Sequence, residues 1–205
     1  MGEQQPMDQA PVRLILMYFI VPLWLAAGVA DWLCHRRAKI QDNASYPESL
    51  LHLLMLAEIG APTLLVLFCK VNALTLAVCI AAFLAHEVTA LWDVSYAVKR
   101  RDVTPVEQHV HSFLELVPLM ALICLAALHW GQFEALFGFG GEAADFSVQV
   151  KQPGLSAGYL TAVLVGVAVF EAAPFAEELI RCVAKRRAER GSVRGVGGLQ
   201  KSGSR

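Results

Sequence analysis

The segment TPVEQHVHSFLELVPLMALICLAALHW, residues 104–130, joins a polar start to a long apolar continuation. Its second part, Phe113–Trp130, carries one charged side chain, that of Glu115. A helix needs roughly 20 mainly apolar residues to cross a bilayer, and this run approaches that length. The segment therefore predicts a membrane-spanning helix that begins with glutamate and histidine residues.

The rest of the chain has the same character. It contains 205 residues, of which 56% are hydrophobic, and its mean hydropathy is +0.50. This is too apolar for an ordinary soluble domain, and a formal net charge of −1 gives no indication of nucleic-acid binding. We predict an all-α integral membrane protein with five transmembrane helices in a single domain, residues 1–182, followed by a basic, disordered cytoplasmic tail, 183–205. The expected spans are 14–33, 50–68, 73–98, 105–130 and 159–182.

Basic residues indicate the orientation of these spans. They cluster after the first, third and fifth spans, whereas the other connections contain few cations. Because positively charged loops stay in the cytoplasm, we expect the N-terminus outside and the C-terminus in the cytoplasm of a bacterial-type inner membrane. The triplet Lys99, Arg100 and Arg101 is expected to anchor this topology, or alternatively to dock an acidic electron donor.

Ionisable residues gather at the predicted cytoplasmic ends of the first four helices. Asp31 and His35 are spaced i,i+4 at the end of the first helix. The other three helices contribute similar acids and imidazoles at a similar depth, with Glu58 nearer mid-membrane and Glu87 close by. The candidate metal ligands are Asp31, His35, Glu48, His52, His86, Asp93, Glu107, His111 and Glu115.

A short internal repeat suggests how these helices are arranged. SYPESLLH, residues 45–52, and TPVEQHVH, residues 104–111, both read hydroxyl, proline, glutamate and then histidine four residues later. We predict that helices one to four form an antiparallel four-helix bundle from two similar hairpins. Inward side chains on facing helices build metal sites in such bundles, so two similar hairpins predict a site for two metal ions.

A second interpretation of the glutamates remains open. Ser45-x-x-Glu48 and Thr104-x-x-Glu107 both match the capping box, in which the glutamate folds back onto the helix start. Glu48 and Glu107 are therefore either caps or ligands. Asp31, His35 and Asp93, taken singly, are equally compatible with polar groups beside the basic loops. Neither capping nor apolar packing explains four inward histidines at one depth, whereas a cation explains them together with the acids.

The predicted ligand set indicates the metal chemistry. Imidazole with carboxylate suits iron, zinc or manganese, and the five scattered cysteines form no CxxC pair. The set is too large for one ion, so we expect two metal ions, with iron favoured, and catalytic roles for Glu58, Glu87 and Glu115. The arrangement resembles the ligand cage of ferritin-like di-iron carboxylate proteins, which implies oxidation of a C–H bond by dioxygen. Those proteins use Glu-x-x-His, whereas this chain has Glu-x-x-x-His twice.

We therefore predict an oxidase-, hydroxylase- or desaturase-type oxidoreductase. It would act on a lipid or another apolar substrate at the cytoplasmic face and take electrons from a soluble donor. A zinc-dependent hydrolase of lipids is the first alternative. A b-type cytochrome is less favoured, because the carboxylates would repel haem propionates. A proton or metal transporter is also less favoured, because the outer halves of the helices are almost wholly apolar. The sequence leaves the oligomeric state open.

Several residues receive simpler interpretations. His109 lies about 200° around the helix from His111 and is not expected to share a centre with it. Glu171, Glu177 and Glu178 are expected to form the kinked, interfacial end of the fifth helix. The outer segment, residues 138–154, is expected to be a loop with a short strand pair.

Overall fold

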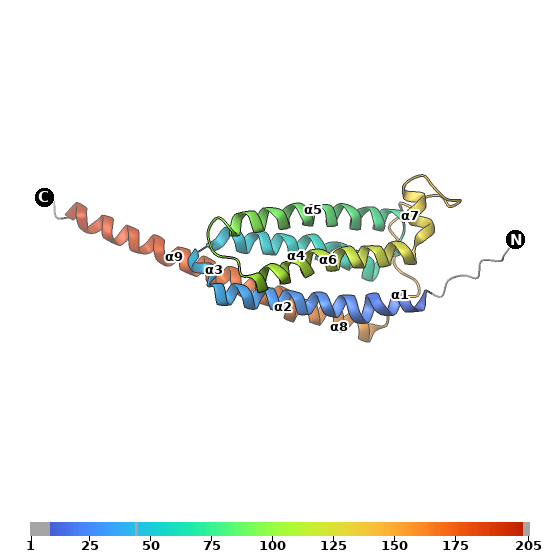
Figure 1. Ribbon diagram of the computed structural model, residues 1–205, viewed down its shortest axis with the longest axis horizontal. Helices are drawn as coiled ribbons and strands as arrows, with labels where there is room; N and C mark the ends of the chain where they lie inside the picture. Colours follow the sequence, from blue (N-terminus) through green and yellow to red (C-terminus); the bar gives the residue numbers. More distant parts are fainter. Residues whose placement is uncertain (1–8, 44, 203–205) are drawn as a thin grey trace.

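Five long helices run side by side along the computed structural model (Figure 1). The structure describes residues 9–43 and 45–202, and within these ranges it is helical with connecting loops and contains no strand. The elements are α1 (Ala10–Ile15), the π-helical turn η1 (Leu16–Ile20), α2 (Val21–Ala38), α3 (Ile40–Asn43), α4 (Ser45–Phe68), α5 (Ala73–Ala97), α6 (Pro105–Leu128), α7 (Trp130–Leu136), α8 (Ala157–Val167), η2 (Ala168–Ala172; π-helical) and α9 (Ala173–Ser202).

The prediction of five membrane helices is confirmed by length and composition. The helices long and apolar enough to cross a membrane cover Ala10–Ala38, Tyr46–Phe68, Ala73–Ala97, Pro105–Leu128 and Ala157–Gly191. Large apolar side chains such as Leu84 and Leu91 are exposed on the outside of the structure. Such an apolar exterior is suited to lipid rather than to water. These features indicate an integral membrane protein.

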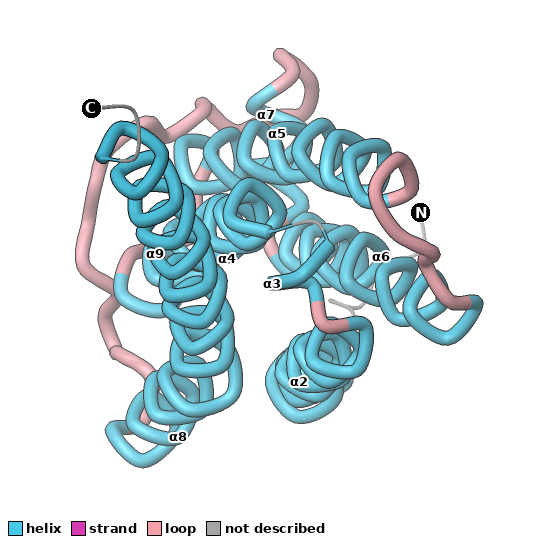
Figure 2. The backbone as a smooth tube through the Cα atoms, turned by 90° about the vertical axis from the view of Figure 1, so that its left-hand side faces the viewer, coloured by secondary structure: helices cyan, strands magenta, loops and turns pink. Residues whose placement is uncertain are grey.

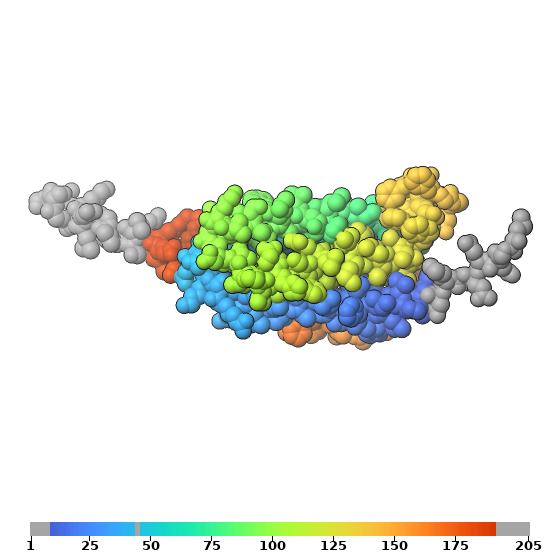
Figure 3. Space-filling model, in the orientation of Figure 1, coloured from blue at the N-terminus to red at the C-terminus, as the bar shows by residue number. Residues whose placement is uncertain are grey.

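The fifth span is part of the same assembly as the other four. Viewed end-on, α2, α6, α5, α4 and α9 follow one another around a common interior (Figure 2). Direct contacts join α2 to α6, α6 to α5, α5 to α4, and α4 to α9, while α9 and η2 also contact α2. A separate bundle of the first four helices is therefore not confirmed. Figure 3 shows one outer face of this assembly, formed by the blue α2, the yellow-green α6 and the green α5.

The two ends of the molecule differ, and we name each after its short helix. At the α3 end, Lys39 adopts a left-handed conformation (φ 51°) that stops α2, and Thr104 begins α6 by accepting a hydrogen bond from the Glu107 backbone N–H. At the α7 end, the loop between α7 and α8 covers the connection between α4 and α5. The predicted strand pair is absent from this described loop, which instead forms a single antiparallel bridge between Cys69 and Val150.

The helix that contains the fifth span is longer than predicted. α9 continues through residue 182 to Ser202, so the residues assigned to a tail prolong the helical backbone, and residues 203–205 lie outside the described part. The separation of this tail from the membrane domain stays a prediction.

Candidate metal centre

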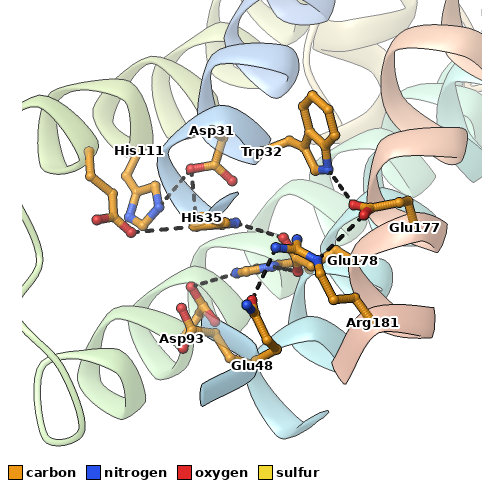
Figure 4. Close-up of polar contacts among 12 residues, drawn as sticks. Asp31, Trp32, His35, Glu48, Asp93, His111, Glu177, Glu178 and Arg181 are labelled. Atoms are coloured by element: carbon orange, nitrogen blue, oxygen red, sulfur yellow. Dashed lines mark hydrogen bonds and ion pairs between the residues drawn. The ribbon is translucent and has the colours of Figure 1, made fainter. Parts of the chain in front are cut away.

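Three histidines from three spans meet inside the assembly near the α3 end. His35 lies on α2, His52 on α4 and His111 on α6, and all three are buried. Glu178 reaches the same place from α9 and is completely buried (Figure 4). The sequence placed the histidines at a common depth, and the structure brings these three together.

Glu178 fixes two of the imidazoles at once. Its Oε2 lies 3.0 Å from Nδ1 of His35, and its Oε1 lies 2.7 Å from Nδ1 of His52. An ionised carboxylate only accepts hydrogen bonds, so each Nδ1–H donates to Glu178, and in a neutral ring the Nε2 atom keeps its lone pair. A carboxylate behind a histidine is the arrangement that orients metal-binding imidazoles in many proteins.

The free nitrogens of these imidazoles face two aspartates. The rings of His35 and His52 stack with centroids 4.3 Å apart and 7° between their planes. Asp31 Oδ1 lies 3.5 Å from His35 Nε2 and 2.9 Å from His111 Nε2, and Asp93 Oδ2 lies 3.4 Å from His52 Nε2. The result is two adjacent groups of donor atoms, one around Asp31 and one around Asp93.

Several of these donor atoms are buried and make no hydrogen bond, although ion-pair contacts such as Asp31 Oδ1 to His111 Nε2 surround them. They are Nε2 of His35, Nε2 of His52, Oδ1 of Asp31 and Oδ1 of Asp93. Buried polar atoms nearly always have a partner, and leaving one without a partner is costly. One donor atom each of Asp31, His35 and His111 lie within 4.8 Å of one another, and the same holds for His35, His52 and Glu178. These residues are therefore suited to hold a cation.

Glu48 and Glu107 have a different partner. The side chain of Arg101 is 3% exposed and forms ion pairs with both carboxylates. Its Nε donates to Glu48 Oε1 at 3.1 Å, and its Nη1 donates to Glu107 Oε2 at 3.0 Å. Arg101 thus gives both glutamates a cationic partner without a metal ion, and Glu107 Oε1 also lies 3.5 Å from His35 Nε2. Arg101 was expected to anchor the topology or to dock an electron donor; the structure adds that its guanidinium lies inside the polar cluster.

The Arg101 guanidinium stays positively charged between Glu48 and Glu107. Burial alone would lower the pKa of the Arg101 guanidinium, but hydrogen bonds to Glu107 and Glu48 outweigh it, and the pKa is raised. The capping box predicted that the Glu107 side chain folds back onto the start of its helix. In the structure Thr104 caps α6, but the Glu107 side chain binds Arg101 instead.

The fourth predicted histidine lies apart from the other three. His86 is seven residues from Asp93 on α5, which is about 10 Å along the helix. It is buried, and its Nδ1 lies 3.9 Å from Glu58 Oε2, while Thr89 Oγ1 donates to Glu58 Oε1 at 2.8 Å. His86 and Glu58 therefore form a second, deeper polar pair.

A small cavity connects the two polar regions. It has a volume of about 60 Å³, and its lining includes Asp31, His52, Asp93 and His111 on one side and His86 and Glu115 on the other. Of the three predicted catalytic glutamates, Glu115 lines this cavity, and Glu58 contacts the lining residue His86. Glu87 is not among the lining residues, although its Oε1 is buried without a partner.

Sequence reasoning missed two glutamates of the fifth span. Glu171 and Glu178 were expected at an interfacial helix end, but they are 1% and 0% exposed. The missed signal is their i,i+7 spacing, which puts both on one helix face. Glu171 also lines the cavity, and its carboxylate fills the space where a Cβ on Gly28 would lie. Only Glu177 fits the expectation, since it is partly exposed and accepts a hydrogen bond from Trp32 Nε1.

His109 lies outside the cluster, as its position on the helix predicts. It is exposed and packs edge-on against Phe113. Among the described residues, the central cluster thus combines imidazoles with carboxylates, a donor set typical of iron, zinc and manganese. Its members are His35, His52, His111, Asp31, Asp93 and Glu178.

No protein-family model, curated protein or solved structure matches this chain.

Proposed function

We propose that the protein is a membrane-embedded oxidoreductase that uses two metal ions, with iron favoured, to oxidise an apolar compound dissolved in the membrane. One observation carries this proposal: buried donor atoms of three imidazoles and two aspartates, several of them without a hydrogen bond, converge beside one cavity. Asp31, His35 and His111 would hold one ion. His52 and Asp93 would hold the second, next to it.

The charges of the site support two ions. Arg101 balances part of the charge of Glu48 and Glu107, so the carboxylates left for the centre are Asp31, Asp93 and Glu178. Three carboxylates packed together in a low-dielectric interior are unfavourable unless positive charge compensates them. Two divalent cations would more than offset them, so the acids that are costly in the free protein become ligands or orienting groups.

Each side chain would have its own task. Glu178 holds the Nε2 atoms of His35 and His52 toward the ions by accepting both Nδ1–H bonds. Bound iron would supply the redox chemistry. The balanced reaction is insertion of one oxygen atom into a C–H bond, with dioxygen, two electrons and two protons giving a hydroxyl group and water. Glu115 lines the cavity and is the residue that we assign to proton delivery, with Glu58 and Glu87 behind it.

The electrons would come from a soluble donor at the α3 end. The polar cluster lies near this end, and the basic residues that follow the first and third spans are at the same end. By the distribution of positive charge, we assign the α3 end to the cytoplasm and the N-terminus to the outside of a bacterial-type inner membrane.

One observation favours a second candidate, a zinc-dependent hydrolase of lipids. Asp31, His35 and His111 make a three-residue set beside a cavity, and catalytic zinc commonly uses three protein ligands with an open fourth position. A cytochrome is disfavoured further, because a cavity of about 60 Å³ is much smaller than the pockets that hold larger cofactors.

Metal content and the visible spectrum of the detergent-purified protein test the proposal. We expect about two irons per chain and no Soret band. One zinc per chain would replace the oxidase with the hydrolase, a Soret band would make the protein a cytochrome, and absence of bound metal would overturn the proposal.

Ligand variants make the test specific. His52→Ala and His111→Ala should each lose metal. His109→Ala is the matched control, because His109 lies two residues from His111 on the same helix but is exposed. Equal metal retention in all three variants would contradict the assigned ligands.

A further inference from the structure

A second and much larger cavity occupies the half of the molecule toward the α7 end. Its volume is about 770 Å³, and side chains from η1, α4, α5 and α6 line it. Most of the lining is apolar, with residues such as Leu16, Val66, Phe83 and Leu125. Pockets that enclose small-molecule ligands typically measure 300–1,000 Å³, so this chamber has the size of a ligand site.

Basic groups surround the outer part of this chamber. Arg13, Lys70, His129 and Lys151 all belong to its lining. Lys70 is paired with Asp145 at 3.3 Å, but no carboxylate in residues 9–43 and 45–202 forms an ion pair with Arg13 or Lys151. The Lys151 ammonium donates one hydrogen bond, to the backbone oxygen of Val66 at 2.7 Å. Two positive charges that have no anionic partner among the described residues therefore lie on one apolar chamber.

The pKa values outside the spans agree with this arrangement. Burial lowers the pKa of Lys151, and the nearby Arg13 lowers it further. Burial also lowers the pKa of His129, with Lys151 and Arg13 adding to the effect. A positive charge that lowers the pKa of a neighbouring base lies close to that base, and an anion placed between the two would offset the repulsion.

The inner end of the chamber adjoins the metal centre. Ile59 lines both the large chamber and the small cavity beside the histidines. On α4, Ile59 lies nine residues from the helix end at Phe68, or roughly 14 Å along the helix, and His52 lies about 10 Å from Ile59 in the other direction. The first distance is about half the thickness of the hydrocarbon core, which is the length of one acyl chain in a bilayer.

We propose that this chamber binds a long-chain fatty acid, with its carboxylate between Arg13 and Lys151 and the far end of its chain at Ile59. A carboxylate matches the fork of Arg13 together with one ammonium group. Among the described lining residues, the charged side chains are Arg13, Lys70 and Lys151 at the outer part and the rest are mainly apolar, which fits a single chain with one anionic headgroup.

This geometry also specifies where the substrate would react. The end of the chain remote from the carboxylate would enter the cavity next to the metal centre, so oxidation would occur near the terminal methyl group. This second statement rests on the proposed function, whereas binding of the fatty acid does not.

Bromine quenching of tryptophan fluorescence tests the orientation of the chain. Trp24 is buried and lines the small cavity beside Ile59. In the full-length protein, 16-bromohexadecanoate should quench the emission of Trp24, and 2-bromohexadecanoate should not. Trp24→Phe assigns the signal, because the difference between the two probes should disappear in this variant. Equal quenching of Trp24 by both probes would overturn the orientation.

Charge variants test the headgroup site. Palmitate binding should weaken by about tenfold or more in Arg13→Gln and in Lys151→Gln, since a hydrogen bond to a charged group contributes roughly 1.5–3 kcal/mol. Lys70→Gln is the matched control and should stay within about twofold of the wild type, because exposed ion pairs contribute little. Hexadecanol has the same chain but no carboxylate. It should bind the wild type no better than palmitate binds the double variant Arg13→Gln/Lys151→Gln.

Three results would reject the proposal. The first is unchanged palmitate binding in the double variant Arg13→Gln/Lys151→Gln, and the second is equal binding of hexadecanol and palmitate to the wild type. The third is a protein that binds lysophosphatidate but does not bind palmitate. The binding assay needs no bound metal, so its failure is distinguishable from failure of the metal analysis.

Discussion

The imidazole rings of His35 and His52 lie face to face, with centroids 4.3 Å apart, and one carboxylate, that of Glu178, binds Nδ1 of both. The pairing joins three spans, α2, α4 and α9. Because Glu178 occupies the same nitrogen on each ring, both Nε2 atoms are presented to the aspartates. The fifth span is therefore as much a part of the candidate centre as the four spans that supply its histidines and aspartates.

Replacement of Glu178 by glutamine should weaken metal binding without removing a predicted ligand. A glutamine of the same shape accepts through only one side-chain atom, so one of the two Nδ1–H groups loses its acceptor. We expect metal affinity to fall by about 10- to 100-fold, as for other outer-shell partners of metal-binding histidines. Competition with a chelator measures this change. Glu177→Gln is the control, since the neighbouring Glu177 is partly exposed, and equal affinity of the two variants would refute the orienting role.

Loss of the Arg101 guanidinium should destabilise the protein. In Arg101→Gln, the buried carboxylates of Glu48 and Glu107 lose their cationic partner. Breaking a buried ion pair by removal of one partner typically costs about 3–5 kcal/mol, so we expect a clearly lower Tm in detergent. Lys99→Gln, at an exposed position of the same turn, should change stability by less than about 0.5 kcal/mol.

A triple variant separates the effect of charge from the effect of packing at the Arg101–Glu48–Glu107 ion pairs. Adding Glu48→Gln and Glu107→Gln to Arg101→Gln removes the uncompensated negative charge. We expect this triple variant to regain a substantial part of the lost stability. A triple variant as unstable as Arg101→Gln alone would show that the guanidinium acts through packing.

Palmitate affinity should decline with rising pH because of Lys151. Burial and the nearby Arg13 place the pKa of the free Lys151 ammonium below its ordinary value of 10.5, and a bound carboxylate raises it again. Binding above the pKa of the free group therefore takes up a proton, and affinity falls as pH rises above this lowered pKa. In Lys151→Arg, whose guanidinium stays charged, the decline should disappear. A decline of the same size in both proteins would assign it to another group.

The helices themselves could be predicted from local sequence. Runs such as Phe113–Trp130 are apolar over the length of a bilayer, and a bilayer accepts such a run as a helix because every backbone polar group is then paired internally. Helix starts were equally local, since Thr104 and Pro105 mark the first turn of α6 in the structure.

The common depth expected for four histidines holds for three of them. His35, His52 and His111 meet, whereas His86 lies deeper beside Glu58. Position along a helix follows from residue number, at about 1.5 Å per residue. The rotation and lateral placement of each helix depend on its neighbours, and these decide which side chains touch.

Arg101 and Glu178 show why the local context was misleading. Arg101 follows two other basic residues and resembles a topology anchor, and Glu178 lies among polar residues near a helix end. Each side chain is buried because it binds a partner far away in sequence. Arg101 forms an ion pair with Glu48, and Glu178 accepts hydrogen bonds from His35 and His52. A buried charge persists only when such a partner compensates for its lost hydration.

By itself, then, the sequence determined the five helices, their apolar surfaces and the level at which acids and histidines gather, because these follow from composition and spacing along one helix. Only the tertiary structure decided that Arg101 takes Glu48 and Glu107, that Glu178 enters the centre, and that a large chamber adjoins it at Ile59. The physical reason is that pairing of buried charges and the shape of a cavity depend on several helices at once.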